Sequence, residues 1–318
     1  MVFLYLSEMN FNRTRLLVFV WMHMVVWSTL GHAQQFQDTF YEQWERQDTS
    51  GMLRFLEKWK ESEPYNPDVY VGYFNYYAIQ TFEEESLLLP EMPQDGGEYI
   101  EVRDSLNNVS GYLSRVMVIN DSVLNIAFDW VDKGIKRFPD RLDLRMGKVY
   151  LAIETDRMEE VYAELQSAIL SGDSIHHEWK WMREEVLDSG QYFLYSSVQG
   201  HLYKLFENQD SVADEIILGI SELILAQDDQ QYFAMTNAAT VFMIKKQFNM
   251  AIDWLKKADK IHEKDSIILS NLGYCYGELQ EWRRARRYYE EALKWSEDDN
   301  GREYCQRQLD RLREEERK

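Results

Sequence analysis

The adjacent histidines His176 and His177 are the residues best suited by type to hold a metal ion. On a helix, neighbouring side chains diverge by about 100°, whereas a zinc-binding helix places two histidines four residues apart with a glutamate between them. None of the six histidines of the chain has that spacing. We therefore predict a solvated helix start at His176 and His177, and we expect neither a metal site nor a cofactor.

Runs of acidic residues offer a second kind of chemistry, because paired carboxylates can bind cations or act in acid–base catalysis. The chain has such runs at Glu83–Glu85, Asp298–Asp299 and Glu314–Glu316. None follows the calcium-loop pattern of spaced Asp or Asn residues with a Gly turn and a closing Glu. In a chain with 55 acidic residues such runs also arise by chance. A solvated surface is the favoured interpretation.

Motifs for phosphate binding and nucleophilic catalysis are also absent from the sequence. Gly96-Gly97 lacks a following Gly-Lys-Ser/Thr, and no Gly-x-Ser-x-Gly elbow occurs. The arginines of Arg283–Arg287 are flanked by glutamates at helical spacing, so pairing within one helix explains them better than a phosphate-binding patch. With no nucleophile, base and orienting group in a recognisable arrangement, we expect no catalytic residues and no enzyme activity.

Aromatic residues carry the strongest signal for binding. Five of them crowd one short segment: Tyr70, Tyr73, Phe74, Tyr76 and Tyr77. A buried core face explains some of them, but five exceed what one buried stripe of a helix can hold, so some must reach the surface. Tyrosine at a surface combines area, rigidity and a polar tip, which suits it to anchor a peptide or a sugar.

Length and composition limit the kinds of protein that can position these residues. The chain has 318 residues, is 45% hydrophobic and contains only five Pro and fifteen Gly, which allows a sizeable core and argues against an all-β fold. The formal net charge of -20 makes nucleic acid an unsuitable ligand, because phosphate binding needs a basic surface. An anionic membrane surface is disfavoured for the same reason.

The N-terminus has the pattern of a signal peptide. Arg13 and Arg15 precede an apolar run, Leu16–Leu30, that is too short for a comfortable membrane span and is followed by Gly31-His32-Ala33. We predict a signal peptide at residues 1–33 with cleavage after Ala33, and a mature chain that is soluble, has no membrane span and is exported to the periplasm or secreted. An uncleaved anchor is the alternative, Met9 is an alternative start, and no Cys follows the run to accept a lipid.

Cys275 and Cys305 are the two cysteines. Both fall in helical segments near the C-terminus, where neighbouring helices could bring them together. A domain of this size does not need a disulfide, so we favour two buried, unpaired thiols and keep a disulfide as the alternative.

A 34-residue periodicity organises the C-terminal part of the chain. Apolar residues from Asp265 to Glu297 have helical spacing on both sides of a polar break at Gln280-Glu281. Small and apolar residues recur at an offset of 34. The matching pairs are Ala239 and Gly273, Phe242 and Tyr276, Ala251 and Ala285, Leu255 and Tyr289, and Ala258 and Ala292, with a second set of Ala127 and Val161, Val131 and Leu165, and Gly134 and Ala168.

This pattern resembles the tetratricopeptide repeat, whose unit is a 34-residue helix–turn–helix, and specifically an exported bacterial protein of that family. The last unit carries the signature positions Leu269, Leu272, Gly273, Tyr276, Ala285, Tyr289 and Ala292. It departs from the family where Leu269 replaces Trp and Glu297 replaces Pro. The resemblance implies an all-α solenoid of five to six helix pairs with a C-terminal capping helix.

The predicted domain spans residues 34–318, and its best-matching repeats are 232–265 and 266–299. The earlier helices are expected at Phe36–Arg46, Gly51–Lys60, Pro67–Thr81, Asp121–Arg137, Leu142–Glu154, Met158–Leu170, Gly190–Glu207 and Ser211–Gln227, with a capping helix at 300–318. Residues 84–119 interrupt this order, and Asp95-Gly96 between apolar runs predicts a small β element or structured loop there. A further insertion, 172–187, is expected to add a helical stretch near Ile175–Leu187.

The resemblance implies a non-catalytic scaffold that binds a protein or peptide in its concave groove. If the repeat register holds, Tyr73, Tyr77 and Tyr274 point into that groove, and we predict them as partner-binding residues. Fold resemblance supports function only by association. A carbohydrate- or envelope-polymer-binding accessory protein is the alternative function, favoured by export and by the abundance of Tyr and Trp.

Overall fold

The computed structural model describes residue 42 and residues 49–93, 97–182, 185–208 and 210–315. The predicted signal peptide at residues 1–33 and the predicted helix Phe36–Arg46, except for Glu42, lie outside the described residues. The described residues form two compact units. The N-terminal unit comprises those up to Glu164 together with Leu170–Ser197, and the C-terminal unit comprises Leu165–Ile169 and those from Val198 onward.

The N-terminal unit is built on antiparallel helices whose ends follow the sequence signals. Its helices are α3 (Thr49–Ser62), α4 (Pro67–Gln80), α5 (Asp121–Arg137) and α6 (Leu142–Glu154), and α7 (Met158–Ser171) and α8 (Gly190–Asn208) contribute residues to both units. Asn66 caps α4 by accepting the Asp68 N–H at 2.8 Å, with Pro67 in the first turn. Asn120 caps α5 in the same way.

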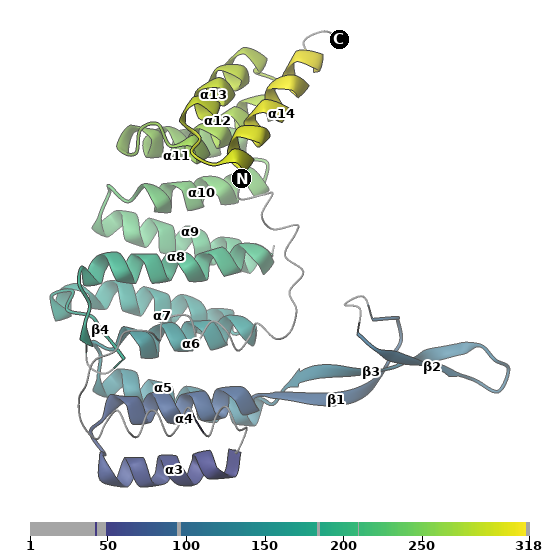
Figure 1. Ribbon diagram of the computed structural model, residues 1–318, viewed down its shortest axis with the longest axis vertical. Helices are drawn as coiled ribbons and strands as arrows, with labels where there is room; N and C mark the ends of the chain where they lie inside the picture. Colours follow the sequence, from purple (N-terminus) through teal and green to yellow (C-terminus); the bar gives the residue numbers. More distant parts are fainter. Residues whose placement is uncertain (1–41, 43–48, 94–96, 183–184, 209, 316–318) are drawn as a thin grey trace. The chain divides into compact units, whose positions relative to one another are not determined.

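The C-terminal unit packs each helix against the next one in the sequence (Figure 1). Its helices are α9 (Ser211–Gln227), α10 (Tyr232–Ile244), α11 (Phe248–Ile261), α12 (Ser266–Glu278), α13 (Trp282–Trp295) and α14 (Asp299–Glu315). Gly273 lets α12 approach α13 closely, because a Cβ there would lie 3.0 Å from the ring of the buried Tyr289. The predicted capping helix is confirmed as α14, which buries Cys305, Leu309 and Leu312.

The turns inside three helix pairs, α6 with α7, α10 with α11 and α12 with α13, repeat one backbone geometry. Asp156, Lys246 and Gln280 have φ values of 57°, 56° and 59° after α6, α10 and α12. In each turn the next residue's N–H returns to a carbonyl of the helix, as from Glu281 to Tyr276 at 2.9 Å. The left-handed residue and this hydrogen bond are the features of a helix C-cap. The predicted fold class, an all-α helical repeat of the tetratricopeptide kind, is confirmed.

A three-stranded antiparallel sheet is inserted between α4 and α5. Its strands are β1 (Phe82–Leu89), β2 (Tyr99–Arg103) and β3 (Val109–Ile119), in the order β1-β3-β2. The β element predicted for residues 84–119 is confirmed; β1 and β2, the strands on either side of Asp95-Gly96, each pair with β3 and not with each other. The hairpin turn follows β2 instead, where Asn107 takes a positive φ of 66°.

The second insertion is not the predicted helix. A single 3-10 turn, Asp173–Ile175, is followed by two short paired strands, β4 (Lys180–Trp181) and β5 (Glu185–Val186). His176 and His177 both take a positive φ, which a continuing helix cannot accommodate. The segment is held in the N-terminal unit by Trp179, which is fully buried and lies under the Arg145 guanidinium at 5.8 Å. Tertiary burial of Trp179 therefore overrides the helical spacing that the sequence shows.

Candidate interaction site

Tyr274 is the predicted anchor that remains accessible in the C-terminal unit. It is the ninth residue of α12 and is half-buried, with its ring edge-on to Phe248 at a centroid distance of 6.0 Å. Burial raises the pKa of its hydroxyl above the ordinary value, and the nearby charge of Glu278 raises it further. The side chain is thus held by packing, while its polar tip stays protonated and able to donate a hydrogen bond.

Ile267 and Ser270 precede Tyr274 on the same face of α12, at the second and fifth positions of the helix. Ile267 is 42% exposed. Together with Ser296 and Tyr304 these two residues line a shallow hollow against the start of α14. One face of the repeat 266–299 therefore offers an exposed apolar side chain and an aromatic ring, while the hydroxyl of Ser270 between them is buried and donates to the Ile267 carbonyl at 3.0 Å.

The same helix position identifies a residue that the sequence argument missed. Tyr150 is the ninth residue of α6 and is half-buried, as Tyr274 is in α12. Burial also raises the pKa of the Tyr150 hydroxyl. Counting from the start of each helix would have revealed this tyrosine, whereas a search for clustered aromatics pointed to the crowded helix α4. In α4 and α10 the ninth position holds Asn75 and Thr240.

Tyr73 lies on a different side of its helix from the one that carries Tyr274 in α12. It is the seventh residue of α4, the position of Leu272 in α12, and only 4% of it is exposed. Its ring stacks on Trp130 of α5 at a centroid distance of 3.9 Å and an interplanar angle of 5°. Burial, with Glu57 nearby, raises the Tyr73 pKa to about 12. These are the properties of a core residue.

Tyr77 is half-buried and lies edge-on to Tyr76 at 5.0 Å. It is the eleventh residue of α4, the position of the buried Tyr276 in α12. The structure therefore brings Tyr73 and Tyr77 to one helix of the N-terminal unit and places Tyr274 in the other unit. Partner binding by the three tyrosines stays a prediction; Tyr77 and Tyr274 are both half-buried, whereas Tyr73 is buried.

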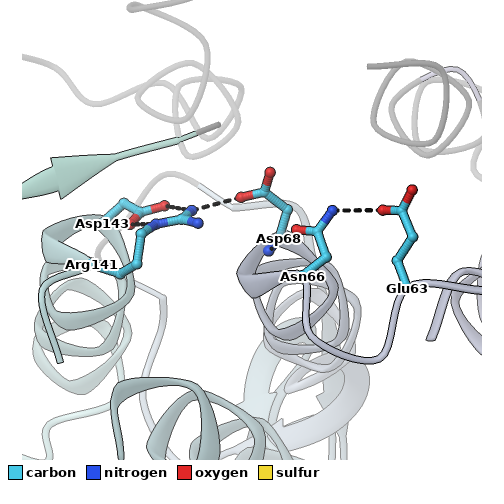
Figure 2. A network of polar contacts seen from close by, with 5 residues as sticks. All are labelled: Glu63, Asn66, Asp68, Arg141 and Asp143. Atoms are coloured by element: carbon cyan, nitrogen blue, oxygen red, sulfur yellow. Dashed lines mark hydrogen bonds and ion pairs between the residues drawn. The ribbon is translucent and has the colours of Figure 1, made fainter. Parts of the chain in front are cut away.

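An ionic network fixes the helix that carries Tyr73 and Tyr77 (Figure 2). The guanidinium of Arg141, which is fully buried, donates to Asp68 of α4 and to Asp143 of α6, both at 2.6 Å. Burial acts against the charged guanidinium, but hydrogen bonds and the charges of Asp143 and Asp68 outweigh it and raise the Arg141 pKa. Arg141 thus ties the N-terminal ends of α4 and α6 together.

The network of Figure 2 continues along the loop before α4. The Asn66 side chain donates to Glu63 at 2.7 Å, while its carbonyl oxygen caps α4. Further along α6, the phenyl ring of Phe74 packs on Gly147, where an added Cβ would lie 3.1 Å from the ring. Helices α4 and α6 are therefore in contact at two levels, one ionic and one apolar.

A polar pair of another kind joins α8 and α10 in the C-terminal unit. The side-chain amides of Gln199 and Asn237 exchange two hydrogen bonds, at 3.0 and 2.7 Å. Because Asn237 is buried, both amides must be satisfied within the protein. This pair fixes the register of α10, which presents Phe233 and Thr236 at its second and fifth positions.

An ion pair and two buried thiols lie in the C-terminal helices beside the site. Arg284 pairs with Glu281 at 2.6 Å, as the helical spacing predicted. Cys275 and Cys305 are both buried and unpaired, which confirms the favoured interpretation, and burial raises the Cys275 pKa to about 12. Among the residues that the structure describes, no group of three or more His, Cys, Asp or Glu is arranged to hold a metal ion, and no helix is long and apolar enough to span a membrane.

Comparison with known proteins identifies the repeat. The family model described as tetratricopeptide repeat matches residues 266–299, the unit for which the sequence resemblance is strongest. The resemblance to this family is therefore confirmed, and its signature lies on α12 and α13. No curated protein sequence matches the chain.

Solved structures with a similar course of helices include the following three proteins. One is YrrB, described as a TPR protein with an unusual peptide-binding site. It is 11% identical with a TM-score of 0.39, and the match covers 79% of this chain and 97% of the YrrB chain. The pilus biogenesis factor PilW has 14% identity and a TM-score of 0.37, with 85% and 97% covered. PilF of Pseudomonas aeruginosa has 10% identity and a TM-score of 0.36, with 86% and 96% covered. At these scores the likeness adds nothing to the assignment, which rests on residues 266–299 and on the helix contacts.

Proposed function

We propose that this protein is a non-catalytic scaffold that binds a peptide or protein segment along the first helices of its repeats, with Tyr274 as the principal anchor. The observation that carries the proposal is one face of α12, on which the exposed Ile267 and the half-buried Tyr274 follow one another at helical spacing. A helix face of this kind provides a rigid aromatic anchor with a polar tip beside an exposed apolar side chain.

Capture experiments with matched variants test the anchor. Wild-type chain, Tyr274→Ala and Tyr192→Ala are each used to capture partners from the native envelope fraction, and captured proteins are then tiled as immobilised peptides. Tyr192 is 76% exposed on α8 and serves as the control. We expect Tyr274→Ala to lose at least about 1 kcal/mol of binding to the captured peptide and Tyr192→Ala to lose almost none.

Equal binding by both variants and the wild type would contradict the assignment of Tyr274. Glycan-dependent quenching of Trp fluorescence, with no captured peptide, would favour the carbohydrate-binding alternative instead. Turnover of an envelope polymer would contradict the non-catalytic part of the proposal.

We also propose that the protein acts outside the cytoplasm, after cleavage behind Ala33. The support is the Arg-flanked apolar run Leu16–Leu30 followed by Gly31-His32-Ala33. The intact mass of exported material should correspond to a chain that begins at Gln34. A full-length product retained in the membrane would contradict cleavage and favour the uncleaved anchor.

A further inference from the structure

The three-stranded sheet forms an arm that leaves the helices at a single closed base. The Asn120 N–H donates to the Thr81 carbonyl at 2.8 Å, and the first paired residues are Phe82 and Ile119. Beyond this base the strands run away from α4 and α5 (Figure 1). Thr81 is fully buried, while β1 has no buried residue. The arm is therefore anchored at one end and open to solvent along its length.

The outer half of the arm exposes apolar side chains on both faces. On one face Leu88, Leu113 and Ile100 form a row across all three strands and are 56%, 38% and 66% exposed. The opposite face carries Leu87 and Tyr99 on either side of Ser114. A soluble protein rarely leaves such a continuous apolar surface uncovered unless it serves an interaction.

The two edge strands of the sheet, β1 and β2, differ in how well they can pair with another strand. β1 pairs with β3 in unbroken register from Phe82 to Leu89, and within the described part of the chain no strand pairs with its outer edge. β2 is shorter, and its register shifts at Val102/Arg103, an irregularity that protects an edge from further pairing. The outer edge of β1 therefore presents a straight row of backbone donors and acceptors.

The charge of the arm indicates what kind of segment can lie there. Residues 82–119 contain eight acidic and two basic residues, and the two arginines lie beside acids of the arm, Arg115 near Glu84 and Arg103 near Glu101. On β1 the acids are grouped: Glu83–Glu85 occupy the half near the base, and Leu87–Leu89 the outer half. An added strand would meet negative charge at one end and apolar side chains at the other.

We propose that the outer edge of β1 binds an extended segment of another protein by strand addition, with apolar residues opposite Leu87–Leu89 and Lys or Arg opposite Glu83–Glu85. Backbone hydrogen bonds to the edge supply the pairing, and the bipartite side-chain pattern supplies the selection. This site lies on the arm and is independent of the helix face proposed above for peptide binding.

A second copy of this chain fits the edge poorly. Parallel pairing of two β1 strands would set Glu83–Glu85 against the same residues, and antiparallel pairing would set them against each other or against Leu87–Leu89. Like charges directly opposite one another destabilise a pair of strands, and a buried unpaired carboxylate is costly. An anionic membrane is disfavoured by the same excess of acidic residues.

The test uses three capped peptides and the purified chain. The matching probe for antiparallel addition is Val-Val-Val-Thr-Lys-Lys-Lys-Thr. The charge control replaces its three Lys with Glu, and the order control, Lys-Val-Thr-Lys-Val-Thr-Lys-Val, retains three Lys, three Val and two Thr in shuffled order. Binding is measured by fluorescence anisotropy, and hydrogen exchange locates the peptide. We expect binding of the matching probe alone, with slowed exchange in Phe82–Leu89 and unchanged exchange in Tyr99–Arg103.

Charge-reversal variants complete the test. Glu83→Lys/Glu85→Lys should weaken binding of the matching probe about tenfold and improve binding of the Glu peptide. Glu85→Lys alone retains the hydrogen bond from Asn120 to Glu83. It should weaken binding of the matching probe and improve binding of the Glu peptide, as in the double variant, but by a smaller factor. Glu290→Lys/Glu297→Lys, on and just after α13, changes the net charge equally and should leave binding unchanged.

Several outcomes would overturn the proposal. They are equal binding of the matching and order-control peptides, a failure of the matching probe to bind up to its solubility limit, and exchange protection confined to the helices. Protection at α12 in place of β1 would support the helix-face function while refuting strand addition, so the two proposals fail separately. Self-association of the free chain that disappears in the double variant would assign the edge to a second copy instead.

Discussion

The N-terminal and C-terminal units treat buried polar groups in different ways. The N-terminal unit buries a charge and surrounds it with partners, since Arg141 is fully buried between Asp68 and Asp143. The C-terminal unit packs small residues such as Gly273, Ala285 and Ala292 among aromatic ones, and burial lowers the pKa of its histidine His201. The repeat 266–299, which matches its family closely, is held by close packing. The pair α4 and α5, which carries the insertion, is fixed in addition by ionic contacts.

The insertion between α4 and α5 explains why the N-terminal unit needs this additional fixing. A tetratricopeptide pair is normally closed by a short turn, which α12 and α13 retain at Gln280. Between α4 and α5 the turn is replaced by the arm, whose ends meet at Thr81 and Asn120. The inserted chain can be long because its two ends stay adjacent, but it no longer sets the angle of the helices. Arg141 supplies a constraint from the next helix.

The largest expected effect is that of removing Arg141. Arg141→Ala leaves Asp68 and Asp143 buried without their cation, which costs about 3–5 kcal/mol of unfolding free energy. Arg157→Ala removes an exposed ion pair with Asp121 and should cost less than about 1 kcal/mol. Urea unfolding followed by hydrogen exchange measures both changes. An equal effect of the two substitutions would contradict the structural role of the buried network.

Tyr73→Ala and Tyr274→Ala separate a core tyrosine from an accessible one. Tyr73 is stacked on Trp130 in the core, so its loss should lower stability by about 3 kcal/mol. Tyr274 is half-buried, and we expect its loss to cost about 1 kcal/mol and to act mainly on partner binding. Melting and binding are measured on the same samples. A large loss of stability at both positions would mean that Tyr274 also belongs to the core.

A smaller effect concerns pH and the C-terminal unit. Burial lowers the His201 pKa from 6.5 to about 4, so between these values the unfolded chain binds a proton that the folded chain does not. Stability is therefore full above about pH 6.5 and falls as the pH approaches 4. The ring is partly exposed by surface area, so the expected loss is about 2 kcal/mol, below the value for a fully dry site.

A comparison of variants separates the effect of His201 on stability from that of carboxylates that titrate over the same pH range. His201→Gln should remove the loss of stability below pH 6.5, while His262→Gln should leave it in place, since the His262 side chain is half exposed. Urea unfolding at pH 7 and pH 4.5 provides the measurement. Identical pH profiles for wild type and His201→Gln would show that His201 is solvated in the folded protein.

The repeat was predictable from sequence wherever side-chain size alone decides the packing. The offset of 34 residues located α10 to α13 because Gly273, Ala285 and Ala292 have to be small for helices to meet. The position of Tyr73 was not predictable, because the aromatic crowding of α4 does not reveal which side faces Trp130. Nor could the segment 172–187 be assigned, since Trp179 lies under Arg145, which is distant in the sequence. Contacts between distant residues decide both cases.

The smallest expected effect is a gain of stability at the turn of the C-terminal repeat. Gln280 has a φ of 59° between α12 and α13, a conformation that costs a residue with a Cβ about 1 kcal/mol and glycine almost nothing. Gln280→Gly relieves this strain but also frees the unfolded chain, which offsets part of the benefit. We expect a net gain of about 0.5 kcal/mol, and a loss for Gln280→Pro, whose ring fixes φ near −65°. Thermal unfolding of the two variants and the wild type measures the order. If Gln280→Gly were the less stable chain by more than about 1 kcal/mol, the side chain of Gln280 would contribute a contact that outweighs the strain of its backbone, and the turn would be held by that contact and not by its geometry.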